Sequence, residues 1–129
     1  MGDIGANVAR RLKVFGAAVL GVKRTAVSAV PADFDEAHTL DALDALLPRA
    51  DIVIGCLPNT RETAGLLTAE RLHAMKAGAV LVNVGRGSLA GTDDLVSVLQ
   101  DGHLGGAHSM CSRPNRFRRT VRCGTWRTC

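Results

Sequence analysis

Apolar residues along the first hundred positions fall into short runs separated by polar, glycine-rich or proline-containing segments. Continuous runs with β-branched residues, at 18–22, 51–57 and 80–84, indicate strands that are covered on both faces. Between these runs apolar residues recur at spacings of three and four, which is typical of helices; the first such series is Ile4, Val8, Leu12 and Phe15. This alternation predicts an α/β fold, a doubly wound parallel sheet with helices on both faces.

The remaining elements are predicted from capping residues and helix breakers. Thr39 is expected to cap a short leucine-rich helix that Pro48 ends, and residues 25–36 are expected to form an irregular connection containing Pro31. Further helices are expected from 68 to about 76 and from a cap at Thr92 to Gly102, with one more strand beginning in 103–107.

The strand at 80–84 ends in a polar corner that is flanked by glycines. Gly85 and Gly87 enclose Arg86 there, so the backbone can approach a ligand closely and the guanidinium can bind a carboxylate with two hydrogen bonds. Ligands of open α/β sheets bind beyond the carboxyl ends of the strands. Arg86 is therefore a candidate binding residue, with an ordinary surface arginine on a turn as the alternative.

The start of the chain resembles part of a phosphate-binding turn. Gly2 and Gly5 have the spacing of the second and third glycines of a G-x-G-x-x-G turn, and a helix follows them. Lys23 and Arg24 follow the strand at 18–22, where a dinucleotide-binding domain usually has an acid that binds the adenosine ribose. Two cations at this position favour a 2′-phosphate and hence NADP over NAD, unless they are simply solvated charges at a strand end.

Charge is distributed unevenly along the 129 residues. Residues 1–107 contain ten Lys or Arg and twelve Asp or Glu, ten minus twelve giving −2, whereas residues 108–129 contain six Arg and no acid, giving +6. The first part therefore does not indicate nucleic-acid binding. No apolar run has the length of a membrane span and no signal-peptide pattern opens the chain, which predicts a cytoplasmic protein. The four cysteines lack metal-ligand spacing, so no metal site is expected, and Cys56 is expected to pack as a small apolar residue.

The abrupt change after Ala107 suggests two segments, 1–107 as the folded domain and 108–129 as an irregular, disordered basic tail. The tail combines six Arg and three Cys with a single aliphatic β-former, Val121. We interpret it as a frame-shifted translation. The alternative, a genuine nucleic-acid-binding tail, is less favoured because its aromatic residues, Phe117 and Trp126, are isolated.

Four motifs in one order resemble the NAD(P)-binding domain of the D-isomer-specific 2-hydroxyacid dehydrogenases. They lie at 2–5, 57–63, 75–87 and 102–107. The resemblance implies a Rossmann-like fold, a nicotinamide dinucleotide cofactor, a small 2-oxo or 2-hydroxy acid as substrate, a homodimer, and a role for Arg86 in binding that substrate during hydride transfer. The residues that it assigns to the cofactor are Gly2, Asp3, Ile4, Gly5, Lys23, Arg24, Leu57, Pro58, Asn59, Val84, Gly85 and Arg86.

The sequence also departs from this family. The first strand and the first turn glycine would precede Met1, and Leu89-Ala90-Gly91 stands where an aspartate is usual. In the strand order 3-2-1-4-5-6, a missing first strand leaves two unpaired edges in the middle of the sheet. None of the four histidines matches the family's general acid, and its partner glutamate and the substrate domain are absent. We therefore expect an inactive fragment of an oxidoreductase; the alternative is a non-catalytic nucleotide-sensing or interaction module with the same fold.

Overall fold

The structure, a computed structural model, describes residues 2–26 and 28–109, which divide into two compact units, Met1–Leu46 and Leu47–Cys129. The first unit contains, in order, α1 (Asp3–Val14), β1 (Leu20–Lys23), β2 (Glu36–Thr39), η1 (Leu40–Ala42) and α2 (Leu43–Leu46). The second contains η2 (Leu47–Arg49), β3 (Ile52–Gly55), α3 (Ala69–Ala74), β4 (Val80–Asn83), η3 (Gly87–Leu89), α4 (Thr92–Gln100) and β5 (Gly106–Ser109). Parallel strands are combined with helices, and apart from β1 and β2, which follow one another directly, helices and strands alternate; this confirms the predicted α/β class.

The first unit is built on a two-stranded parallel sheet. Leu20 pairs with Glu36 and Lys23 with Thr39 in the register of β1 and β2. Asp35, just before β2, accepts hydrogen bonds from the Val19 N–H at 2.7 Å and from Lys13 Nζ of α1 at 2.6 Å. The Lys13 ammonium is the main reason that the pKa of Asp35 lies below its ordinary value. Asp35 thus links α1 to both strands.

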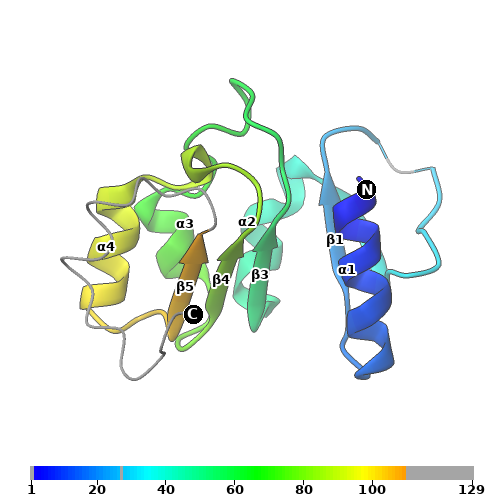
Figure 1. Cartoon of the computed structure of the whole chain (residues 1–129), viewed down its shortest axis with the longest axis horizontal. Coiled ribbons are helices and arrows are strands. Elements are labelled where there is room, and N and C mark those ends of the chain that lie inside the picture. The colour runs from blue at the N-terminus through cyan, green and yellow to red at the C-terminus, as the bar shows by residue number, and fades with distance from the viewer. Residues whose placement is uncertain (1, 27, 110–129) are drawn as a thin grey trace. The chain divides into compact units, whose positions relative to one another are not determined.

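The second unit is built on a three-stranded parallel sheet in the order β3-β4-β5. Ile52 pairs with Val80, and Val80 with Gly106, so the three strands run in register. Figure 1 shows all three arrows pointing the same way, with the loops after β3 and β4 extending beyond the arrowheads. The segments that follow these strands are therefore at one edge of the sheet, the edge that binds ligands in open α/β folds.

The described strands form two sheets instead of one, with β1 and β3 each at an edge of its own sheet. Each of these edge strands has one side without a partner strand among residues 2–26 and 28–109.

The core of the second unit consists of aliphatic side chains and one methionine from its helices and its central strand. The most deeply buried are Leu47, Leu72, Met75, Leu81 and Val98. Helices α3 and α4 pack against each other. In β4 the buried positions alternate, so that Leu81 and Asn83 are buried. Asn83 is thus a polar side chain at the end of an otherwise apolar buried strand.

Several sequence predictions need correction. Residues 36–39 form β2, which the sequence did not predict because its polar residues are only half-buried and the strand pairs with β1 alone. The helix expected after Thr39 is broken into η1, α2 and η2. Thr39 ends β2 and also stands at the N-cap position of η1, but its side chain makes no capping hydrogen bond. Gly91, not Thr92, is the residue before α4.

Of the four apolar residues expected on one face of the first helix, Ile4 and Phe15 are 58% and 84% exposed, and Phe15 lies just beyond the end of α1. His108 and Ser109, which we assigned to the tail, are in β5. The rest of the predicted tail, 110–129, lies outside the described residues. Within the described part of the chain, no helix has the length and hydropathy needed to cross a membrane, and no group of three or more potential metal ligands is found.

We predict that Leu72→Ala destabilises the second unit by about 2 to 5 kcal/mol, because the side chain is 0% exposed and its loss leaves a cavity in the core. Urea unfolding followed by circular dichroism measures this change. Val14→Ala is the control, since Val14 is 82% exposed and such surface changes stay within about 0.5 kcal/mol. Equal free energies of unfolding for the two variants would contradict the assigned core.

Candidate functional site

Arg86 lies on a turn that the buried side chain of Asn83 holds in shape. Asn83 is 5% exposed. Its Oδ1 accepts a hydrogen bond from the Gly85 N–H at 3.0 Å, and its Nδ2 donates to the Arg86 carbonyl at 2.8 Å. One amide group thereby satisfies two backbone groups of a turn that cannot continue the sheet. The Arg86 side chain is exposed, and no residue of the described ranges forms a hydrogen bond or ion pair with its guanidinium.

The turn after β4 lies directly against the loop after β3. The N–H groups of Val84 and Gly85 both donate to the Gly55 carbonyl, at 3.0 and 3.1 Å. A Cβ on Gly85 would lie 2.5 Å from the Leu57 carbonyl oxygen, so only glycine permits this approach. The predicted residues Leu57, Val84, Gly85 and Arg86 are therefore neighbours in space.

The loop after β3 is fixed by a threonine pair and by the segment that follows Arg86. Thr63, 7% exposed, donates from Oγ1 to the Pro58 carbonyl at 2.6 Å and accepts from the Thr60 N–H at 2.9 Å. Ser88 Oγ donates to Asn59 Oδ1 at 2.9 Å. Pro58 and Asn59 are exposed, and their position relative to the Arg86 turn is therefore held by hydrogen bonds.

In the first unit, Gly2 to Gly5 form the start of α1. Gly2 precedes the helix with extended backbone, and its carbonyl accepts from the Ala6 N–H at 3.0 Å. A Cβ on either Gly2 or Gly5 would meet nothing within 4 Å. Packing among the described residues therefore does not require glycine at these two positions. The backbone N–H groups of Asp3 and Ile4 belong to the first turn, where helix N–H groups have no partner within the helix.

Lys23 and Arg24 lie at the carboxyl end of β1. Lys23 is the last residue of the strand, half-buried and in register with Thr39, and Arg24 follows it with an exposed side chain. Two cations therefore adjoin the end of a parallel strand, as the sequence predicted.

Two histidines lie far from the Arg86 turn. His103 comes before β5, and its carbonyl accepts from the N–H of Gly78, which comes before β4. His103 and its neighbour His73 are therefore at the amino ends of the strands, whereas Arg86 is at the carboxyl ends (Figure 1). Cys56, just after β3, is half-buried, and this burial raises the pKa of its thiol.

The fold combines parallel strands with helices. A glycine-containing turn precedes α1, and the loops after β3 and β4 lie at the carboxyl ends of the strands, where such sheets bind ligands. These features define a Rossmann-like nucleotide-binding domain. Residues 1–114 match the model of the D-isomer specific 2-hydroxyacid dehydrogenase, NAD binding domain. The chain belongs to this family, and its domain is the one that binds a nicotinamide dinucleotide.

Similar proteins agree with this assignment. A glyoxylate reductase of Thermococcus onnurineus is 39% identical over 106 residues, covering 82% of this chain and 31% of that protein. The structure of a D-isomer specific 2-hydroxyacid dehydrogenase family protein from Aeromonas salmonicida superposes with a TM-score of 0.82 at 39% identity, covering 94% of this chain and 38% of that one. A family member from Xanthobacter autotrophicus, solved with NADPH and MES, gives a TM-score of 0.82 at 33% identity, covering 94% and 38%. The chain spans about a third of the length of these proteins.

The sequence did not predict the residues whose side chains hold the loops after β3 and β4 in place. Asn83 shapes the Arg86 turn, Thr63 fixes the loop after β3 and Ser88 joins the two segments, yet none was predicted as a site residue. A signal existed for Asn83, since a lone amide directly before a glycine corner can cap the turn through its side chain. Thr63 bonds to Pro58 and Thr60 within its own loop, whereas Ser88 bonds to Asn59 of the other loop and has no comparable local signal.

We predict that Gly85→Ala destabilises the second unit by about 1 to 3 kcal/mol and displaces the Arg86 turn, because the new Cβ would overlap the Leu57 carbonyl. Thermal unfolding measures the loss, and amide chemical shifts of residues 57–59 report the displacement. Gly106→Ala is the matched control, since a Cβ there meets nothing within 4 Å. Unchanged shifts at 57–59 in Gly85→Ala would contradict the close approach of the two loops.

Proposed function

We propose that these residues are the NADP-preferring nucleotide-binding domain of a D-2-hydroxyacid dehydrogenase that reduces 2-oxo acids by hydride transfer. The observation that carries the proposal is Arg86, an exposed cation on a turn braced by Asn83 at the carboxyl end of β4. Family membership supplies the cofactor class, and the position of Arg86 supports substrate binding.

Arg86 suits a 2-oxo acid for electrostatic reasons. A guanidinium offers two parallel N–H groups to a carboxylate, and it stabilises the negative charge that develops on the carbonyl oxygen as hydride arrives. Its guanidinium is not committed to another described residue, so it can bind a substrate without first breaking an ion pair. The proposed role of Arg86 is therefore to bind and orient the substrate and to stabilise the alkoxide.

The proposed cofactor residues lie in both units. Gly2 and Gly5 leave open space over the first turn of α1, where unpaired N–H groups can bind a phosphate. Asp3 and Ile4 contribute their N–H groups to this turn. Lys23 and Arg24 are proposed to bind a 2′-phosphate, and the loops with Leu57, Pro58, Asn59, Val84 and Gly85 to contact the rest of the dinucleotide. The Xanthobacter relative, whose structure contains NADPH, supports the choice of NADP.

A second candidate function, a non-catalytic nucleotide-sensing or interaction module, is favoured by the histidines. His73 and His103 are at the wrong end of the sheet to protonate a substrate held by Arg86. Family resemblance extends the main proposal to a homodimer in the cytoplasm. Cofactor binding is common to both candidate functions, and turnover separates them.

We predict that the chain binds NADP more tightly than NAD. Each charge-assisted hydrogen bond from Lys23 or Arg24 to a 2′-phosphate is worth about 1.5 to 3 kcal/mol, so a single such bond favours NADP by about tenfold to a hundredfold. Isothermal titration with both cofactors measures the preference. The double substitution of Lys23 and Arg24 by Ala should abolish it, whereas Arg11→Ala removes an exposed cation from α1 and should not. Equal or tighter NAD binding by the unsubstituted chain would contradict this assignment.

We predict that the 129 residues assayed alone do not turn over 2-oxo acids. General acid catalysis contributes typically about 10² to 10⁴-fold, and none of the four histidines matches the position of the family's acid. Loss of reduced-nicotinamide absorbance with glyoxylate, hydroxypyruvate, pyruvate and phenylpyruvate tests this. A saturable rate that disappears in Arg86→Ala would show that another group supplies the proton, and loss of the same rate in His108→Gln would identify it.

A further inference from the structure

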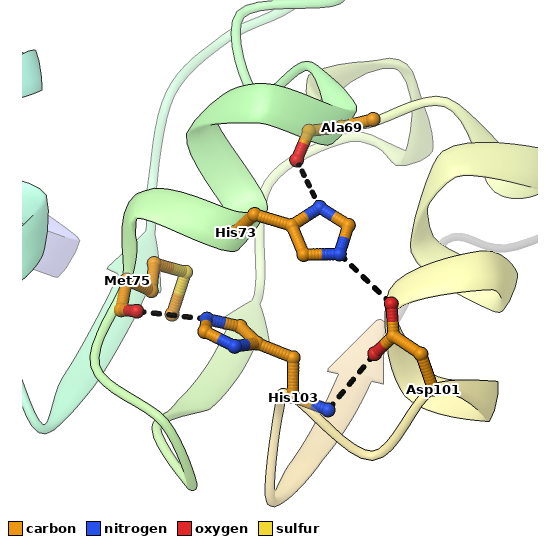
Figure 2. Close-up of polar contacts among 5 residues, drawn as sticks. All are labelled: Ala69, His73, Met75, Asp101 and His103. Carbon is orange, nitrogen blue, oxygen red and sulfur yellow. Dashed lines mark hydrogen bonds and ion pairs between the residues drawn. The ribbon is translucent and has the colours of Figure 1, made fainter.

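A polar cluster at the amino ends of the strands joins α3 to the turn between α4 and β5 (Figure 2). His73 of α3 donates from Nδ1 to the Ala69 carbonyl at 2.9 Å and from Nε2 to Asp101 Oδ2 at 2.8 Å. The other carboxylate oxygen of Asp101 accepts from the His103 N–H at 2.9 Å. His103 Nε2 in turn donates to the Met75 carbonyl at 2.9 Å.

Both ring nitrogens of His73 lie within hydrogen-bond distance of an acceptor oxygen. Each nitrogen faces an oxygen that can only accept, a backbone carbonyl on one side and a carboxylate on the other. A neutral imidazole has a single N–H, so it can satisfy one of these oxygens and turns a lone pair toward the other. Both contacts are favourable together only in the imidazolium form.

We propose that His73, Asp101 and His103 form a proton-operated clasp, closed when His73 is charged, that holds the α4–β5 turn against α3. The clasp is distinct from the cofactor residues, since it lies at the opposite ends of the strands from Arg86. Its carboxylate couples the two histidines: Asp101 binds the ring of His73 and the backbone of His103 at once. Loss of the His73–Asp101 hydrogen bond frees the Asp101 carboxylate to move, which weakens its hydrogen bond with the His103 N–H.

Asp101 is the charged group that dominates the surroundings of His73. Its carboxylate is the first reason that the pKa of His73 lies above its ordinary value, followed by the Ala69 carbonyl. The ring of His103 lies 5.3 Å away between centroids.

The other charged residues nearby have contacts of their own or lie elsewhere on the packed elements. On and beside α3, Glu70 accepts from Thr68, Arg71 donates to the Leu66 carbonyl, and Lys76 pairs with Asp51. Arg49 belongs to η2, and Asp93 and Asp94 are in the first turn of α4, at the opposite end from Asp101.

The direction of the pH dependence follows from the pKa shifts of His73 and Asp101. A raised pKa means that the contribution of His73 is complete below its ordinary pKa of about 6.5 and is lost as pH rises through the folded-state value. The pKa of Asp101 is lowered, first by the His103 N–H and then by His73, so its contribution is present above its unfolded pKa of 3.8 and is lost only in stronger acid. The clasp is therefore closed below about pH 6.5 and opens as the pH rises through the raised folded-state pKa of His73.

The test is a pH titration of the full chain by NMR, reading the imidazole shifts of His73 and the exchange protection of the His103 amide. We expect His73 to titrate above about 6.5. Protection of the His103 amide, corrected for intrinsic exchange, should fall by about two- to fivefold across that transition, a range set by the modest strength of exposed ion pairs. His73→Gln and Asp101→Asn should both remove the pH dependence.

His38→Gln is the matched control. His38 is also partly exposed and also bonded to a carboxylate, with 2.8 Å between its Nε2 and Glu36 Oε2, but it belongs to the first unit. This variant should leave the His103 amide unchanged. The proposal is overturned if His73 titrates at or below about 6.5. It is equally overturned if the exchange protection of the His103 amide does not change with pH in the unsubstituted chain, or if that protection falls to the same extent in His73→Gln.

Discussion

The geometry of the candidate site depends on one buried amide, the side chain of Asn83. It occupies the position in β4 where a further apolar residue would continue the core, and it binds the Gly85 N–H and the Arg86 carbonyl instead. A buried polar group is tolerated when its hydrogen bonds are made, and here both ends of the amide are satisfied. The turn that carries Arg86 can therefore lie within the close-packed carboxyl edge of the sheet, and Gly85 can approach the Leu57 backbone.

The elements that sequence could predict are those determined by local pattern. The strands β3 and β4, the helix after Gly2 and the Arg86 corner each follow from apolar runs, caps or glycine spacing within a few residues. The misses have a different origin. Residues 36–39 become a strand only because β1 offers a partner, and the polar pattern of Glu36 and His38 has no apolar signal. Likewise Ser88 of the segment after β4 bonds to Asn59 in the loop after β3, a relation that no single segment contains. Both the strand and the supporting side chain depend on contacts between distant segments, which the periodicity of one segment does not encode.

The second unit separates its polar chemistry between the two ends of one sheet. At the carboxyl ends, Arg86, Pro58 and Asn59 are exposed, and the buried side chains of Asn83 and Thr63 bond to the backbone beside them. This arrangement suits ligand binding. At the amino ends, the histidines and Asp101 bond to one another and to backbone carbonyls, and these bonds join the helical layer to the turn before β5. Because β4 pairs with β5 along its whole length, the turn before β5 and the turn after β4 are connected by a single ladder of backbone hydrogen bonds.

The free edges of β1 and β3 determine how far the described residues can act alone. A parallel strand is stabilised by partners on both sides, and an edge of apolar residues, such as Ile52 with 55% of its surface exposed, exposes unpaired backbone groups beside apolar side chains. The two groups of proposed cofactor residues lie next to these edges in sequence and fold, Lys23 at the end of β1 and Leu57 just after β3. Each free edge therefore adjoins a segment that contains residues proposed for cofactor binding.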